Sequence, residues 1–175
     1  MNYFLGKKNM EKKLRIMIFV CVLLLSLLLF GCDRSFYFKN TESTDLSQEE
    51  LDGLRLHQNI NDEWFIRKYG KQTNKSSDNE FYDYYLLSNG LEIATTDDGE
   101  IVRIMGHIQQ THRGITFGDS KNDVIEAYGE NFYHRIEQGT DIIGYIDWEI
   151  NATLEFWLDH EEKIVEIRFD DVTVQ

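Results

Sequence analysis

The sequence predicts an α+β fold in which two related units, each a helix followed by an antiparallel meander, form one small domain. Two apolar stripes with helical spacing end in Tyr-Gly, at Tyr69-Gly70 and at Tyr128-Gly129. Glycine directly after such a stripe is a common left-handed helix stop. Alternating apolar and polar residues follow each stripe and are broken by turn residues such as Asn89-Gly90 and Asp98-Gly99. These dipeptides favour hairpins because they tolerate positive φ.

The first unit is expected to start with a helix and to continue as three strands. Ser47 and Glu50 match a capping box and predict a short helix near 48–52, before the unit proper. The apolar stripe of the unit's own helix comprises Phe65, Ile66 and Tyr69. Alternation then predicts the three strands at 81–87, 91–95 and 100–105.

The second unit is expected to have the same order of elements. Asp119 or Ser120 caps its helix, and Gly129 ends it. The buried stripe of this helix comprises Val124, Ile125 and Tyr128. Strands are predicted at 142–150, 153–158 and 163–169.

The chain also repeats itself. Leu56 to Gly70 aligns without gaps with Ile115 to Gly129, and Leu91 to Ile104 aligns with Leu154 to Ile167. Two matches in the same order at similar offsets indicate a duplicated unit, although generic strand patterns can also align by chance. The predicted organisation is a signal segment at 1–31, a lipidated cysteine, tether and short helix at 32–52, and the two units at 53–112 and 113–175.

A leader precedes the domain. Five basic residues come before an uncharged run from Ile16 to Phe30, and Gly31-Cys32 follows. This pattern is typical of a secretory signal, whereas an uncleaved spanning helix, the alternative, needs about 20 apolar residues. The Gly-Cys junction resembles a bacterial lipoprotein signal, which implies cleavage before Cys32, a lipid on its thiol, and a place at the cell membrane facing outside the cytoplasm. Met1 or Met10 is the start.

Composition limits what the domain can bind. The leader carries 5 of the 18 basic and 1 of the 31 acidic residues, which leaves 13 basic and 30 acidic residues, a net charge of −17. A domain with this charge repels nucleic acids. Its acidic surface is either simply solvated or binds a cationic partner. With Cys21 removed and Cys32 lipidated, no thiol remains for catalysis or zinc binding. We expect no cofactor and no metal, and the Lys-, Asn- and acid-rich composition without proline indicates a Gram-positive host.

Strand alternation predicts a sheet face that the helices do not cover. In the second unit this face holds Tyr145, Asp147, Glu149, Glu155, Trp157, Ile164, Glu166 and Arg168. In the first unit it holds Glu92, Ala94, Ile101, Arg103 and Met105, with Asp83 and Tyr85 beside them. Aromatic residues and arginine are enriched in protein interfaces, so this face is the predicted partner-binding surface. Its candidate contact residues are Tyr145, Trp157, Arg168, Asp147, Glu149 and Arg103; cover of Trp157 from within the protein is the alternative.

The stretch Gly114 to Gly129 (GITFGDSKNDVIEAYG) resembles the helix entry of the SmpA/OmlA envelope lipoproteins and of the related β-lactamase-inhibitor-protein-like modules. The resemblance implies helix-plus-meander modules in tandem and binding to other envelope proteins without chemistry. The chain departs from the pattern at Asn59, which stands where the second copy has Gly118.

These observations favour a lipid-anchored extracytoplasmic module that recognises an envelope or secreted protein through the open sheet face. No nucleophile, phosphate-loop or metalloprotease motif occurs, so an enzyme is not expected. One alternative is a structural or assembly factor of the envelope. A less favoured one is a hydrolase of wall polymer that uses Asp147 and Glu149, two acids on one predicted face.

Overall fold

The computed structural model describes residues 34–106 and 110–174, so the signal segment and Cys32 lie outside the described residues. Residues 37–175 form one compact unit. The helices are α2 (Ser35–Phe38), α3 (Glu63–Tyr69) and α4 (Lys121–Tyr128). The strands are β1 (Ser77–Asp78), β2 (Asp83–Leu86), β3 (Glu92–Thr95), β4 (Ile101–Gly106), β5 (Tyr133–Glu137), β6 (Thr140–Asp147), β7 (Ala152–Leu158) and β8 (Ile164–Asp171). In the part of the chain described, no helix has the length and apolar run needed to cross a bilayer.

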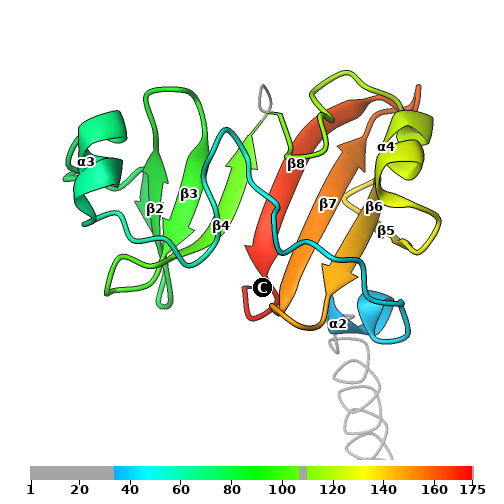
Figure 1. The fold of residues 1–175 in the computed structure, drawn as a ribbon, viewed down its shortest axis with the longest axis horizontal. Coiled ribbons are helices and arrows are strands. Elements are labelled where there is room, and N and C mark those ends of the chain that lie inside the picture. Colours follow the sequence, from blue (N-terminus) through cyan, green and yellow to red (C-terminus); the bar gives the residue numbers. More distant parts are fainter. Residues whose placement is uncertain (1–33, 107–109, 175) are drawn as a thin grey trace, which may run out of the picture. The chain divides into compact units, whose positions relative to one another are not determined.

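The predicted fold class is wrong, because the protein is largely β. All the strands join one antiparallel sheet in the order β1-β2-β3-β4-β8-β7-β6-β5 (Figure 1). Strands β4 and β8 pair directly, with Arg103 opposite Asp170 and Gly106 opposite Ile167. This pairing merges the strands into one continuous sheet, and α3 and α4 are only 7 and 8 residues long. The predicted boundary between 112 and 113 therefore lies inside one compact unit and stays a prediction.

Local signals around α4 are confirmed. The Ser120 hydroxyl accepts a hydrogen bond from the Asp123 N–H, and the Asp123 carboxylate accepts one from the Ser120 N–H, which completes a capping box. Gly129 follows the helix with φ 95°, a value that residues with a side chain rarely adopt. The sequence thus places both ends of this helix correctly.

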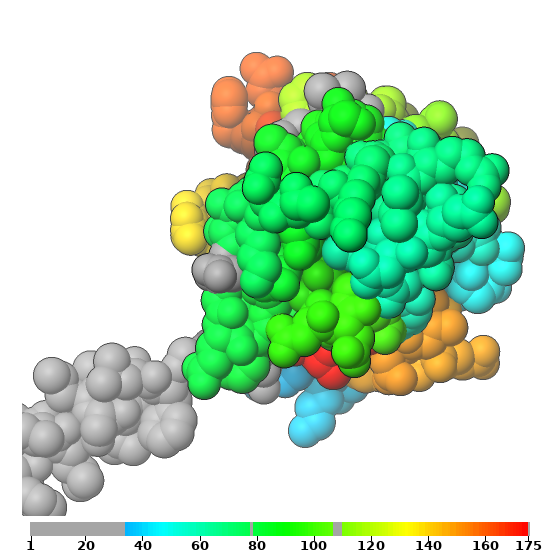
Figure 2. Space-filling view, turned by 90° about the vertical axis from the view of Figure 1, so that its left-hand side faces the viewer, coloured from blue at the N-terminus to red at the C-terminus, as the bar shows by residue number. Residues whose placement is uncertain are grey.

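Both longer helices contribute to one core on one face of the sheet, called here the helix face. Phe65 of α3 and Val124 and Tyr128 of α4 belong to the same buried cluster. Ile104 of β4 and Phe156 of β7 are among the strand residues in that cluster. Figure 2 shows α3 and the segments beside it next to strands β2–β4. The opposite face of the sheet is therefore the one that these two helices leave uncovered.

The short helix predicted at 48–52 is absent, and turns take its place. Ser47 donates its N–H to Asp45, and Glu50 pairs with Arg55 rather than closing a capping box. Glu49 is only 3% exposed and accepts hydrogen bonds from the His112 N–H at 2.6 Å and from the Tyr128 hydroxyl at 2.7 Å. Burial and, secondarily, the Glu49 carboxylate raise the pKa of Tyr128. A long-range contact thus overrides the local capping pattern.

Strand β5 was not predicted, and it brings Tyr133 against β6. Tyr133 lies opposite Gly144, and a Cβ at position 144 would come within 2.3 Å of the Tyr133 ring. The glycine is needed here for this close approach, not for an unusual φ.

Gly144→Ala is expected to lower the free energy of unfolding by about 1–3 kcal/mol, the usual cost of overpacking. The added methyl must push the Tyr133 ring away from the sheet. Urea unfolding measures the effect. In a Tyr133→Ala background the same change should cost much less, and an equal cost in both backgrounds would contradict the assigned contact.

The β7–β8 turn gives the fold an acid sensitivity. The Lys163 N–H donates to the Asp159 carboxylate at 2.9 Å, and this bond, the largest contribution, helps to hold the pKa of Asp159 below its ordinary value of 3.8. A depressed folded-state pKa stabilises the fold above the ordinary value, and this contribution is lost as pH falls through the folded pKa. Between about pH 5 and pH 2, unfolding free energy should therefore fall more steeply in the wild type than in Asp159→Asn. Chemical unfolding at several pH values tests this, and parallel curves would refute it.

Candidate binding surface

The sheet face opposite the helix face carries charged and aromatic side chains. Cross-strand register pairs them: Arg168 lies opposite Glu155, and Trp157 lies opposite Glu166. We call this surface the polar face. Its members are Leu86, Glu92, Arg103, Met105, Tyr133, Arg135, Glu155, Trp157, Glu166, Arg168 and Asp170.

Two buried ion pairs fix the polar face. Arg103 of β4 makes two hydrogen bonds to Asp170 of β8, at 2.9 and 3.0 Å. Arg135 of β5 makes two to Glu155 of β7, both at 2.8 Å, and the Tyr133 hydroxyl donates to the same carboxylate at 2.7 Å. Bidentate pairs of this kind hold side chains in a single geometry. The polar face is therefore rigid at both pairs.

Trp157 lies between two arginines. The Arg168 guanidinium is 3.8 Å from the centre of the indole ring, and that of Arg135 is 5.4 Å away. Trp157 is 9% exposed, and its buried Nε1–H has no hydrogen-bond partner among residues 34–106 and 110–174. Buried tryptophan N–H groups usually find an acceptor, so this unpaired donor is unusual. The ring face itself is occupied by Arg168, which leaves little of it for stacking.

Three of the predicted contact residues come together on the polar face. Arg103, Trp157 and Arg168 lie on β4, β7 and β8, which are neighbours in the sheet. Glu155 and Glu166, also predicted on this face, are found there. Arg135 and Arg168, both from the sheet itself, contribute to the internal cover considered for Trp157.

The other three lie elsewhere. Tyr145 belongs to the helix face, where its ring packs 5.2 Å from that of Tyr128 and its hydroxyl donates to the Gly129 carbonyl. Asp147 is 3% exposed and accepts from backbone N–H groups of Leu46 and Glu149. Glu149 is an exposed turn residue. Asp147 stabilises the turn in which Glu149 lies, and the two carboxylates do not form a catalytic pair across a cleft.

The face assignment of Tyr145 is wrong for a physical reason. Alternation along the predicted strand at 142–150 places Tyr145 on the open face, but β6 ends at Asp147 and a turn follows. Within β6 every residue from Ile142 to Asp147 is buried, so there is no polar side to set the alternation. Ile146 packs on Phe38 and Tyr133 instead of joining the helix-face core.

Three further residues assigned to the open face, Tyr85, Ile101 and Ile164, belong to the helix-face core. A register shift occurs between Ala94 and Thr95 where β3 meets β4, and another between Trp157 and Leu158 where β7 meets β8. Each bulge inserts a residue and reverses the alternation beyond it. Bulges leave no clear mark in the sequence.

A pocket of about 290 Å³ opens on the polar face beside Arg168. Its walls come from strands β2, β3, β4 and β8 and from Gly90 in the turn before β3: Leu86, Gly90, Glu92, Met105, Gly106, Glu166 and Arg168. Arg168 and Glu166 form an ion pair with each other. The pocket thus combines two apolar side chains, one internal ion pair and a further carboxylate.

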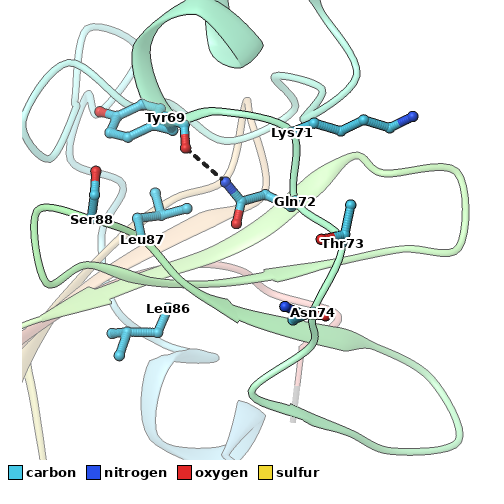
Figure 3. Close-up of a pocket in the computed structure, with 8 residues that line it drawn as sticks. All are labelled: Tyr69, Lys71, Gln72, Thr73, Asn74, Leu86, Leu87 and Ser88. Atoms are coloured by element: carbon cyan, nitrogen blue, oxygen red, sulfur yellow. Dashed lines mark hydrogen bonds between the residues drawn. The ribbon is translucent and has the colours of Figure 1, made fainter.

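A second pocket of about 400 Å³ lies after α3 (Figure 3). It is lined by Tyr69, Lys71, Gln72, Thr73, Asn74, Leu86, Leu87 and Ser88. Figure 3 shows Gln72 turned back to the Tyr69 carbonyl, and this hydrogen bond of 3.1 Å ends the helix. The other polar residues of this pocket are Lys71, Thr73, Asn74 and Ser88, and Leu86 is its one lining residue that also belongs to the polar face.

Sequence reasoning missed Arg135 and Tyr133, because β5 was not assigned. The alternation from Tyr133 to Glu137 and the following turn at Gln138 and Gly139, with φ values of 51° and 85°, were the available signals. Among residues 34–106 and 110–174, no group of three or more His, Cys, Asp or Glu side chains is placed to hold a metal ion.

Comparison with known proteins gives no relative: no protein-family model, no curated protein and no solved structure matches this chain.

Proposed function

We propose that this chain is a lipid-anchored extracytoplasmic module that recognises an envelope or secreted protein through the polar face. The observation that carries the proposal is Trp157, a buried indole that contacts Arg135 and Arg168 and whose N–H has no acceptor in the part of the chain that the structure describes. Tryptophan and arginine are the residues most enriched among binding hot spots.

The geometry of the face supports a binding role. The ion pairs of Arg103 with Asp170 and of Arg135 with Glu155 hold its side chains in place before a partner arrives. Such preorganisation lowers the entropic cost of association. The net charge of −17 beyond the leader would attract cationic proteins and reject anionic ones.

Wall-polymer hydrolysis is less well supported. Asp147 serves as a buried acceptor for backbone N–H groups, and Glu149 follows in the same turn. A glycosidase needs two carboxyl groups facing each other across a substrate bond.

The lipoprotein resemblance and the membrane location remain predictions from the leader and from Cys32.

The test uses the full tagged chain, crosslinked in its native envelope and purified. Leu86→Arg places a charge on the polar face at a side chain that is 63% exposed, so the fold should tolerate it. The matched control is Ile66→Arg, on exposed α3. Loss of one captured protein in Leu86→Arg alone supports the proposal, and its equal capture by both variants contradicts it.

A further inference from the structure

The polar-face pocket holds a carboxylate with no partner. Glu92 of β3 is half-buried, and no hydrogen bond or ion pair is formed by its side chain within the described part of the chain. Its cross-strand neighbours are Leu86 on β2 and Met105 on β4, which offer it no donor. Partial burial of an unpaired charge is unfavourable, and a cation would relieve it.

Arg168, the cationic residue that lines the pocket, already interacts with other residues. The Arg168 guanidinium lies over the Trp157 ring at 3.8 Å and is paired with Glu166. The pair is neutral as a unit, so the pocket keeps one uncompensated negative charge, that of Glu92. A single cationic group that enters the pocket would neutralise this charge.

From this geometry we infer that the pocket receives a lysine or arginine side chain of the partner protein, an assignment that rests on the proposed function. Leu86 and Met105 would contact the aliphatic stem while Glu92 accepts hydrogen bonds from the charged end. The volume of about 290 Å³ is near the lower limit of ligand sites, about 300 Å³, and suits one side chain. An anionic group in the pocket would be repelled by the Glu92 carboxylate.

A titration without any protein partner tests the chemistry. The chain has four methionines. Met105 lines the pocket. Full-length protein in detergent micelles, labelled with ¹³C at the methionine methyl groups, reports on the pocket through the Met105 signal. The probes are N-acetyl-arginine amide and N-acetyl-lysine amide, and the uncharged control is N-acetyl-norleucine amide.

We expect a saturable shift of the Met105 signal with at least one cationic probe and none with the norleucine probe. Glu92→Gln should weaken binding about tenfold, the usual contribution of a charge-assisted hydrogen bond. Glu126→Gln, an exposed change on α4, should leave the affinity unchanged. No saturable shift, or equal binding to wild type and Glu92→Gln, overturns the inference.

The two proposals can fail separately. If Glu92→Gln leaves the capture of the partner in the native envelope unchanged while Leu86→Arg abolishes it, the polar face binds a protein but the pocket does not take its cation. If the cationic probes bind as expected and no protein is captured, the proposed function fails and the chemistry of the pocket stands.

Discussion

Glu155→Gln is expected to lower the free energy of unfolding by about 3–5 kcal/mol, the usual cost of breaking a buried ion pair. Glu155 is fully buried and accepts two hydrogen bonds from Arg135 and one from Tyr133. The substitution keeps the side-chain volume but turns one acceptor oxygen into a donor NH₂ group that faces other donors. Urea unfolding of the full chain in mild detergent, followed by circular dichroism, measures the change.

Glu137→Gln is the matched control, because Glu137 pairs with the same Arg135. The Glu137 side chain is 39% exposed, so water screens its charge, and its loss should cost less than about 1 kcal/mol. A similar cost for the two variants would show that Glu155 is not the buried partner of Arg135 that the structure assigns.

Tyr145→Ala is expected to destabilise the fold by about 3–5 kcal/mol, as other large aromatic-to-alanine changes in cores do. Tyr145 is fully buried between the rings of Tyr128 and Phe156 on the helix face. Tyr145→Phe keeps the ring and removes the hydrogen bond to Gly129, which should cost about 1 kcal/mol. Thermal and urea unfolding measure both effects.

Phe81→Ala supplies the comparison, since Phe81 is 69% exposed and its loss should change stability by less than about 0.5 kcal/mol. The result for Tyr145→Ala also distinguishes the interface position that alternation predicts from the core position that the structure shows. A stable Tyr145→Ala protein that has lost its partner would support the interface role that alternation predicted, and would contradict the core position.

Elements with local signals could be predicted from the sequence. The helix from Lys121 to Tyr128 has its cap in Ser120 and its stop in Gly129, as local sequence signals predict. The hairpin turns at Asn89-Gly90 and Asp98-Gly99 were equally clear, because glycine at positive φ is needed there.

Long-range pairing could not be predicted in the same way. The pairing of β4 with β8 brings Arg103 opposite Asp170, residues that are 67 positions apart in the chain. No local pattern specifies that contact, and without it the strands look like two separate meanders. The fold class therefore had to be corrected from α+β units to one largely β sheet.

The candidate site was predictable in part for the same reason. Alternation placed Trp157 and Arg168 correctly, because the strands around them have one face lined with charges. It failed for Tyr145, where both faces of β6 are buried. It also missed Arg135, which reaches Trp157 from a strand whose turn, Gln138-Gly139, is a weaker signal than Asn-Gly.

The most direct test of the polar face as a protein-binding surface is site-specific photo-crosslinking in the native envelope. A photoreactive amino acid replaces Met105 on the polar face in one full-length variant and Glu126 on exposed α4 in another. We expect that Met105 alone yields an adduct with one protein, whose linked segment is then mapped by mass spectrometry. The same adduct from both positions, from Glu126 alone, or from neither would contradict it.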